Sequence, residues 1–260
     1  MKKGICCFVM LLLLCGCAIP VNQSTAQTPT QEPVTTQFST EVPTQEPTQA
    51  PTEAPTQEPT QAPTEAPTQA PALVKKGSVG VQSVSELSMY DVVTFGRYTQ
   101  GALGSESPIE WYVVQKEGNR AMLLSKYALD SKRYHDNNTK LAWEGSDLYK
   151  WLNHQFKESA FTEQETELLT APVTLLSFSQ ANELPKTILV CASTDYAVSN
   201  GGDQNRCIWW LSDYSGAVEY WDGTISHNAS AVTEDGTVAR EGYQVNFNSK
   251  FVRPVIIVEL

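Results

Sequence analysis

Aromatic and acidic residues gather in one part of the sequence, where they could bind a ligand. The stretch CIWWLSDYSG places two adjacent tryptophans before an acid and a tyrosine, and a second aromatic and acidic run, EYWDG, follows it. Flat aromatic faces beside carboxylates suit a sugar or a peptide, because ring stacking and hydrogen-bond acceptors can then act together. The candidate ligand-binding residues in this region are Trp210, Asp213, Tyr214, Trp221 and Asp222.

The two adjacent tryptophans also constrain how this part of the chain packs. In a strand, neighbouring side chains point to opposite faces, so Trp209 and Trp210 cannot enter the same core. We expect one ring to anchor the fold and the other to be more accessible, either against helices or open to a groove. The alternative is a core on both faces with both rings buried. Separately, residues 219–222 could be a plain strand and turn instead of part of a binding site.

Arg253 is a further candidate for contact with a ligand. It lies between Val252 and Pro254, at the entry to the last predicted strand. Its guanidinium could face a ligand as a cation, or it could hold loop carbonyls or a buried acid through its fork of donors. We favour the structural role and keep the ligand-facing role as the alternative.

Signatures of catalysis are sparse. The sequence has three histidines: His135 precedes an aspartate in a polar loop, His154 falls in a predicted helix, and His227 falls in a loop. The patterns HExxH, CxxC and GxSxG do not occur, and no spaced set of oxygen ligands for calcium is visible. We therefore predict no catalytic residue, no metal site and no cofactor.

Cys191 and Cys207 are the only cysteines after residue 77. In an oxidising exterior they could form a disulfide, and closing a loop of that size would contribute about 3 kcal/mol to stability. Two buried free thiols explain the same residues equally well, so the sequence leaves both states open.

The first residues predict a lipoprotein signal peptide, residues 1–16. The chain begins with MKK and continues with an apolar run from Ile5 to Leu14, which is too short to span a bilayer as a mature helix. Gly16 precedes Cys17 as in a bacterial lipobox, so we expect Cys17 to carry a diacylglycerol anchor. Ordinary signal cleavage without a lipid is the alternative.

Residues 17–76 form the predicted linker. From Pro43 the sequence reads PTQEPTQAPTEA, and the same unit returns from Pro55. Proline restricts its own φ and the residue before it, and almost no large apolar group is present to offset the entropy of ordering the chain. We expect a disordered, extended spacer that could reach on the order of 150 Å and whose threonines could be O-glycosylated.

Residues 77–260 are long enough for one domain with a sizeable core. Acidic residues outnumber basic residues by 23 to 14 in this segment. Such a domain repels a phosphate backbone, so we expect no nucleic-acid partner. Strand patterns at both ends and short helical patterns in the middle predict an α+β fold.

The expected elements follow from side-chain periodicity and from capping and turn residues. Ser146 caps one predicted helix, and the capping box of Thr162 and Glu165 begins another that ends near Leu169. A third helix is expected at 180–184. The expected strands are 91–96, 109–114, 120–125, 173–176, 207–211 and 252–260, with turns at 117–119, 222–224 and 234–236.

A series of short motifs occurs in a fixed order from Tyr90 to Leu260. It comprises FGRY, WYVV followed by MLLSKYAL, WEGSDLYKWLN, AFTEQE, TDYA, WWLSDYSG and FVRP. This order resembles a bacterial family of domains of unknown function that is common in surface proteins and lipoproteins of Firmicutes. That family usually has WWLRSPG and GVRP, so Ser212 and Phe251 depart from its arginine and glycine. The layout is also similar to a C-type-lectin-like fold, as in formylglycine-generating enzymes and phage receptor-binding proteins, which by itself implies no activity.

These features together predict a lipid-anchored protein on the extracellular face of the cytoplasmic membrane that displays a non-catalytic binding module. Its expected partners are the membrane, through the N-terminal lipid, and a glycan or a surface protein as ligand. One alternative is an extracellular enzyme acting on cell-wall or other surface material, which His135 and the acids after Trp210 would favour. The other alternative is a structural or interaction lipoprotein.

Overall fold

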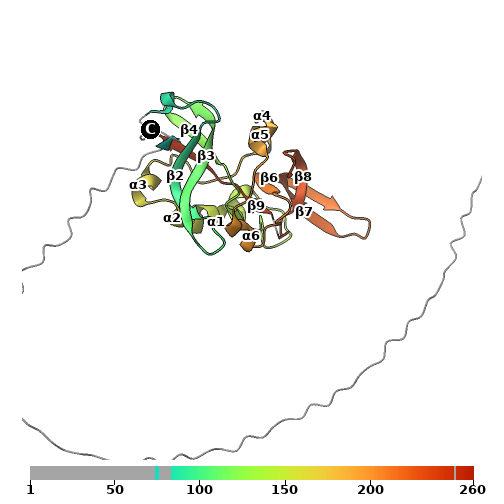
Figure 1. Cartoon of the computed structure of the whole chain (residues 1–260). Helices are drawn as coiled ribbons and strands as arrows, with labels where there is room; N and C mark the ends of the chain where they lie inside the picture. The colour runs from blue at the N-terminus through green and yellow to red at the C-terminus, as the bar shows by residue number, and fades with distance from the viewer. Residues whose placement is uncertain (1–73, 76–82, 249) are drawn as a thin grey trace, which may run out of the picture. The chain divides into compact units, whose positions relative to one another are not determined.

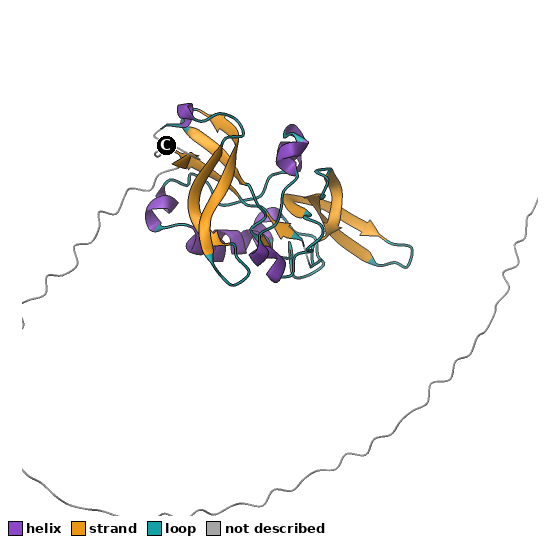
Figure 2. Cartoon of the chain, in the orientation of Figure 1, coloured by secondary structure: helices purple, strands orange, loops and turns teal. Residues whose placement is uncertain are grey.

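The expected α+β fold is confirmed by the computed structural model, which describes residues 74–75, 83–248 and 250–260 (Figure 1). Strands dominate the described residues, and the helices between them are short (Figure 2). The predicted signal peptide, the predicted lipidation site Cys17 and the proline-rich repeat lie outside the described residues. Within the described part, no helix is both long enough and apolar enough to cross a membrane.

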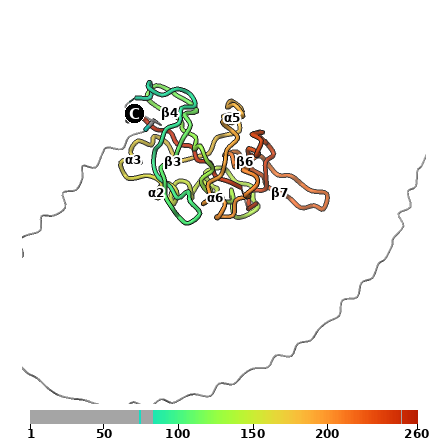
Figure 3. The backbone as a smooth tube through the Cα atoms, viewed as in Figure 1, coloured from blue at the N-terminus to red at the C-terminus, as the bar shows by residue number. Residues whose placement is uncertain are grey.

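The first sheet contains the predicted hairpin and ends with the C-terminal strand. Its strands lie in the order β1-β2-β3-β4-β10, and each is antiparallel to its neighbours. Gly118, in the turn between β3 and β4, has a φ of +58°, a conformation that glycine adopts without strain. Figure 3 shows the C-terminal strand returning to lie beside β4. The bounds are β1 (Val74–Lys75), β2 (Val92–Thr99), β3 (Glu106–Glu117), β4 (Arg120–Ser125) and β10 (Val255–Glu259).

The second sheet is built around a long hairpin, β6–β7. Its strands lie in the order β5-β9-β6-β7-β8, with β9 parallel to β6 and the other pairs antiparallel. The strand predicted at 207–211 therefore continues much further, to Glu219. Two register shifts in the pairing of β6 with β7, on either side of Tyr214, bend the hairpin. The bounds are β5 (Asp130–Ser131), β6 (Trp209–Glu219), β7 (Ile225–Val232), β8 (Val238–Gln244) and β9 (Phe251–Val252).

The helices begin where the sequence predicts caps. The Ser146 side chain accepts from the Tyr149 N–H, and Thr162 with Glu165 forms the expected capping box. Ser177 with Gln180 forms a second box, so the helix predicted at 180–184 begins earlier. The bounds are η1 (Val84–Glu86), η2 (Trp143–Gly145), α1 (Asp147–Trp151), the π-helical turn η3 (Leu152–Phe156), α2 (Lys157–Ala160), α3 (Glu163–Glu167), α4 (Phe178–Glu183), α5 (Lys186–Leu189) and α6 (Asp195–Ser199).

The buried strand predicted at 173–176 is wrong, because this segment is not a member of either sheet. Its only ladder contact is an isolated bridge between Thr174 and Val255. The side-chain amide of Asn153 takes the place of a neighbouring strand: it donates to the Val173 carbonyl and accepts from the Val173 N–H, each at 2.9 Å. The segment is largely buried, as its apolar residues predict. The Asn153 side chain satisfies the backbone of Val173, while main-chain groups of Val255 and Ser212 bond to Thr174 and Leu176.

The last two strands pass from the second sheet to the first through Arg253 and Pro254. The Arg253 side chain is fully buried at this joint. Its guanidinium donates to the carbonyl oxygens of Ser125 at 2.7 Å, of Ile188 at 2.7 Å and of Leu189 at 3.2 Å. One side chain thus holds β4 and α5 against the point where the chain changes sheets.

The buried apolar residues form two clusters, and β6 contributes to both. Trp210 belongs to the larger cluster, which also contains Trp111 and Phe156, whereas Trp209 belongs to a second cluster with Phe251. Strand alternation therefore separates the two tryptophans as expected. Because each face of β6 near Trp209 is covered by a core, the fold positions the start of this strand rigidly.

Candidate functional site

The distal half of the β6–β7 hairpin extends beyond its own sheet. The start of β6 is fully buried, its middle is half-buried, and Ala217 to Glu219 are exposed. On the other side, β8 pairs only with residues 228–232 of β7. The end of the hairpin therefore stands clear of the third strand, as the ribbon in Figure 2 shows.

Large apolar side chains cover the end of this hairpin although solvent surrounds it. Trp221, in the turn, is 98% exposed. Three neighbours along the two strands are also exposed, and we call the set the tip cluster: Val218, Tyr220, Trp221 and Ile225. The register pairs Val218 with Ser226 and Glu219 with Ile225, so Val218 and Ile225 lie on opposite faces of the hairpin and the tip cluster surrounds its end. Single exposed apolar residues are common, whereas several around one projecting end indicate an interaction site.

Backbone hydrogen bonds and one carboxylate hold the turn that carries Trp221. The Gly223 N–H donates to the Tyr220 carbonyl at 2.9 Å, and the Tyr220 N–H donates to the Thr224 carbonyl at 2.8 Å. Gly223 has a φ of +82°, as this kind of hairpin loop requires. The Asp222 carboxylate accepts from the Thr224 N–H at 2.9 Å, and this hydrogen bond holds the pKa of Asp222 below its usual value. Asp222 therefore orders the turn and presents Trp221.

Two contacts fix the hairpin further back. The Tyr214 hydroxyl lies 2.6 Å from Nδ1 of His227, and the two rings stack. Along the edge of β7 beyond its ladder with β8, the Asn138 side chain donates to the Ile225 carbonyl at 2.6 Å and accepts from the His227 N–H at 2.8 Å, and the His227 carbonyl accepts from the Val245 N–H. Asn138 thus replaces a missing neighbour strand just behind the tip cluster, which keeps an exposed hairpin ordered.

The structure contradicts the expectation that one of the two adjacent tryptophans is accessible. Both indoles are fully buried, and each N–H is satisfied: Trp209 donates to the Leu189 carbonyl and Trp210 to the Lys132 carbonyl. Tyr134 also packs edge-on against Trp210. Residues 132–134 cover the face of β6 on which Trp210 lies, which is opposite to the face of Trp209. Trp210 therefore has no free ring face for a ligand.

Asp213 and Arg253 are likewise engaged in the fold. The Asp213 carboxylate accepts from the Phe178 N–H at 2.5 Å, at the start of α4. The Arg253 guanidinium is buried against backbone carbonyls and lies 5.0 Å from the Trp209 ring. The ligand-facing role of Arg253 is therefore wrong, and the structural role is correct. Of the predicted ligand residues, only Trp221 and Asp222 lie at the exposed end of the hairpin, and Tyr214 supports its base.

The fold brings Cys191 and Cys207 together. It does not pair His135 with Asp136. Cys191 and Cys207 are half-buried free thiols with their sulfur atoms 3.3 Å apart. Nδ1 of His135 lies 2.6 Å from a carboxylate oxygen of Asp147, whereas Asp136 points to solvent and is not its partner. Among the described residues, no group of three or more histidine, cysteine and acidic side chains is placed to hold a metal ion.

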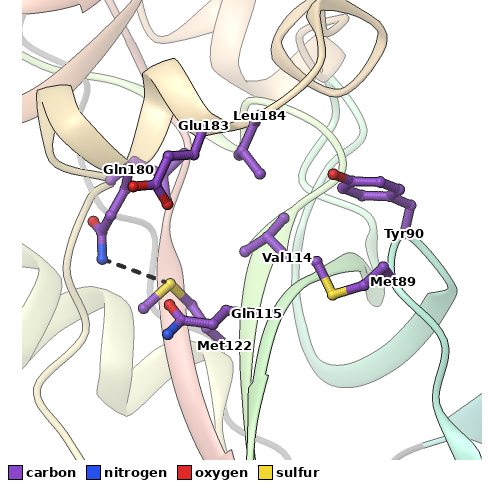
Figure 4. A pocket seen from close by; sticks show the side chains of 9 residues that line it. Met89, Tyr90, Val114, Gln115, Met122, Gln180, Glu183 and Leu184 are labelled. Atoms are coloured by element: carbon purple, nitrogen blue, oxygen red, sulfur yellow. Dashed lines mark hydrogen bonds between the residues drawn. The ribbon is translucent and has the colours of Figure 1, made fainter.

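A small cavity lies apart from the hairpin, between α4 and the first sheet (Figure 4). Its volume is about 170 Å³. Met89 and Tyr90 line one side and residues of α4 line the other, with Met122 accepting a weak contact from the Gln180 amide. A cavity of this size is smaller than those that enclose drug-sized ligands, so it is a weaker candidate than the hairpin.

Sequence reasoning found the turn but missed most of the tip cluster. Val218 and Ile225 are not among the residues that the sequence indicates for ligand binding. An Asp-Gly turn with apolar residues on both sides nevertheless indicates a hairpin, with those apolar residues near its end. No local pattern indicated Asn138, because its two contacts join residues far apart in the sequence. Tyr220 was noted only as a neighbour of Trp221.

The comparisons with known proteins bear on the middle of the domain. A family model described as a domain of unknown function, DUF6273, matches residues 118–187. No curated protein and no solved structure matches the chain. The matched segment runs from the β3–β4 turn through α4 and includes Asn138, and it ends before the hairpin that carries the tip cluster.

Proposed function

We propose that this protein is a non-catalytic binding module that inserts the tip cluster into an apolar pocket on a protein partner. The observation that carries the proposal is Trp221, which is 98% exposed at the end of a hairpin that extends beyond its sheet. Tryptophan and tyrosine are the residues that most often dominate binding energy at protein interfaces, where they fill pockets and lose contact with water.

The shape of the site favours a protein over a glycan. Sites for small molecules and sugars are concave, with polar groups converging on the ligand. The tip cluster is instead the convex end of a hairpin, and the carboxylate next to Trp221 is already bonded to the Thr224 N–H. Val218 and Ile225 add aliphatic surface, which suits a protein pocket better than a sugar ring. A glycan that stacks on Trp221 and Tyr220 is the alternative ligand.

The sequence supplies the proposed setting. Lipidation of Cys17 would hold the chain on the outer face of a bacterial cytoplasmic membrane, and the proline-rich linker would carry the module away from it. In this setting the module meets soluble proteins and proteins of neighbouring surfaces. A rigid hairpin with exposed aromatic residues loses little conformational entropy on binding, because the turn is already ordered.

The test is photo-crosslinking of the full chain on the surface of cells that express it. The photoreactive residue is introduced as Trp221→p-benzoylphenylalanine, and Leu103→p-benzoylphenylalanine is the matched control, because Leu103 is also fully exposed but lies in the β2–β3 loop. We expect one discrete protein adduct from position 221 and none from position 103. Excess wild-type chain should abolish the adduct, and excess Trp221→Ala chain should not.

Two outcomes would count against the proposal. Equal adducts at positions 221 and 103 would mean that the hairpin has no specific partner. The second outcome is that the chain binds a glycan on an array, that Trp221→Ala abolishes this binding, and that no protein adduct forms. This result would favour a glycan as the ligand of the tip cluster. With an identified partner, Trp221→Ala should weaken binding by about 2 kcal/mol or more, which is roughly 30-fold in Kd.

A further inference from the structure

We infer that Cys191 and Cys207 form a thiol–disulfide exchange site, in which Cys191 is the nucleophile and Cys207 the resolving thiol for a small disulfide. The inference is independent of the hairpin. It rests on three structural facts: the two sulfur atoms lie 3.3 Å apart, both residues line an open cavity, and the buried Arg253 guanidinium donates to the carbonyl of Leu189, two residues before Cys191.

The fold brings the two thiols together from separate segments. Cys191 follows α5, and a bridge between Ala128 and Ser193 fixes the backbone just after it. Cys207 precedes β6, whose first residue, Trp209, is buried in the core. Because both backbones are held, the sulfur atoms stay within reach of each other, as sequential attack on a disulfide requires.

The charge beside the thiols distinguishes this pair from inert buried cysteines. The Arg253 guanidinium donates to backbone carbonyls, and no carboxylate among the described residues pairs with it. Burial lowers the pKa of Arg253, and the charges of Cys191, Cys207 and Tyr112 oppose that effect. A buried cation without a carboxylate partner favours a negative charge nearby, and a thiolate of this pair supplies one.

The two thiols are not equivalent. The hydrogen bond from Cys207 lowers the pKa of Cys191 against the opposing effect of burial, and the charge of Arg253 and the backbone of Ala128 also lower it. The same hydrogen bond, together with burial, raises the pKa of Cys207. Cys191 therefore carries the thiolate, and Cys207 keeps its proton until the second step.

The cavity indicates the class of substrate. Its volume is about 440 Å³, which is within the range of small-molecule sites. Besides the two cysteines, its lining includes Asp195, Arg206 and Glu234. Charges of both signs suit a zwitterionic disulfide such as cystine, whose ammonium and carboxylate groups can each find a partner.

The proposed exchange is balanced in atoms and electrons. The Cys191 thiolate attacks one sulfur of the disulfide RSSR, forms a Cys191–SR mixed disulfide and releases RS⁻. Cys207 then loses its proton to solvent, attacks the Cys191 sulfur, and releases the second RS⁻, which leaves a Cys191–Cys207 disulfide. The substrate disulfide is reduced by two electrons and the protein dithiol is oxidised by two. Two external thiols reverse the reaction.

The experiment uses the full chain with Cys6, Cys7, Cys15 and Cys17 replaced by serine, so that Cys191 and Cys207 are its only thiols. The protein is reduced and freed of reductant, cystine is the probe, and intact-mass spectrometry is the readout. We expect the wild-type chain to lose two hydrogens as the bridge forms. Cys207→Ser should stop at a mixed disulfide on Cys191. Cys191→Ser is the matched control and should react about tenfold more slowly, because burial still raises the pKa of Cys207 after the Cys191 thiol is removed. Cys191 in the folded Cys207→Ser chain should also react with iodoacetamide about tenfold faster at pH 7 than in urea, because the serine hydroxyl can donate in place of the Cys207 thiol and because Arg253 and the Ala128 backbone still lower the pKa of Cys191.

Three results would overturn the inference. The first is equal trapping in the two single variants, because it would remove the distinction between nucleophile and resolving thiol. The second is slower alkylation of the folded chain than of the unfolded chain, which marks shielded, inert thiols. The third is a native bridge that reductant opens only after denaturation, which marks a structural disulfide. Circular dichroism of each variant shows whether it is folded, and none of these results depends on the tip cluster.

Discussion

The hydroxyl of Tyr98, on β2 of the first sheet, donates to the carboxylate of Asp130, on β5 of the second, at 2.8 Å. Both residues are buried. The other oxygen of Asp130 accepts from the Ser131 N–H at 2.7 Å and from the Asn200 amide at 2.9 Å. The Tyr98–Asp130 hydrogen bond joins the two sheets near the joint at Arg253, because Asp130 pairs with Val252, which directly precedes Arg253. Burial together with the charge of Asp130 raises the pKa of Tyr98 well above its usual value.

The Tyr98 contact predicts a loss of stability in alkaline solution. In the unfolded chain tyrosine loses its proton near pH 10, whereas folded Tyr98 keeps it, so the unfolded state binds fewer protons above pH 10. Tyr98 should therefore lower the free energy of unfolding by about 1.4 kcal/mol for each pH unit above 10. Below pH 10, Tyr98 should make no pH-dependent contribution, because it is protonated in both states. Urea titrations from pH 8 to 11 measure the slope. Tyr98→Phe should remove this contribution, and Tyr220→Phe, on the exposed turn, is the control; equal slopes in the two variants would contradict the prediction.

The two buried tryptophans should matter equally for stability. Trp209→Ala and Trp210→Ala each leave a large cavity, so each should lower the free energy of unfolding by about 3–5 kcal/mol. Trp210→Ala also removes the donor to the Lys132 carbonyl, whereas the Leu189 carbonyl keeps its bond from Arg253 in Trp209→Ala. Trp221→Ala should change it by no more than about 0.5 kcal/mol, because that side chain packs in neither cluster. Denaturant unfolding of the three variants checks the contrast. A small effect at Trp210 would mean that one face of β6 is open after all.

Trp221 should dominate the solvent-accessible fluorescence of the domain. The chain has six tryptophans; Trp221 is almost fully exposed, Trp143 and Trp151 are partly buried, and the other three are buried. Trp221→Phe should therefore remove most of the emission that acrylamide quenches and shift the remaining spectrum to the blue. Trp151→Phe is the matched control and should leave most of the quenchable emission in place. Comparable quenching in both variants would show that the tip cluster is covered in solution.

Asn138 should control the order of the hairpin. Asn138→Ala removes two hydrogen bonds from the edge of β7, each contributing about 1 kcal/mol, so the His227 amide should exchange with solvent faster than in the wild-type chain. Asn153→Ala is a close control, because Asn153 makes the same pair of contacts with Val173. Hydrogen exchange read by NMR should show that each variant affects its own segment. Faster exchange at His227 in both variants would indicate general destabilisation instead.

Cys17 should determine whether the chain stays with the membrane. Mass spectrometry of the membrane fraction should find a diacylglyceryl group on Cys17 as the mature N-terminal residue, and Cys17→Ala should release the chain into the medium or leave it unprocessed. Cys15→Ala tests the neighbouring cysteine and should change neither outcome. Firm membrane association of a Cys17→Ala chain that has lost its signal peptide would contradict lipid anchoring at this residue.

The features that could be predicted from the sequence are those set by residues close together in it. The caps at Ser146 and Thr162, the hairpin around Gly118 and the turn at Asp222 and Gly223 all depend on a few adjacent residues, and all are present. Alternation also predicted correctly that Trp209 and Trp210 face different surroundings, because it depends only on the geometry of a strand.

What could not be predicted depends on contacts between distant segments. Tyr134 and Lys132 cover the Trp210 ring and so exclude it from solvent. They lie beside β6 because of the order of the strands in the sheet. The role of Arg253 is decided by carbonyls of Ser125 and Ile188, which only the passage from β9 to β10 brings near it. The candidate site shows the same limit: the turn was foreseen, and its support by Asn138 was not.

The separation of the tip cluster from both buried clusters bears on how the protein can evolve. Trp221 touches neither core, and the turn beneath it is held by backbone hydrogen bonds together with Asp222 and Gly223. Substitutions at position 221 therefore escape the selection for packing that constrains Trp209 and Trp210. Related chains could change partners by altering this one position while the scaffold drifts slowly, and a designer could use the same hairpin to present a chosen binding motif.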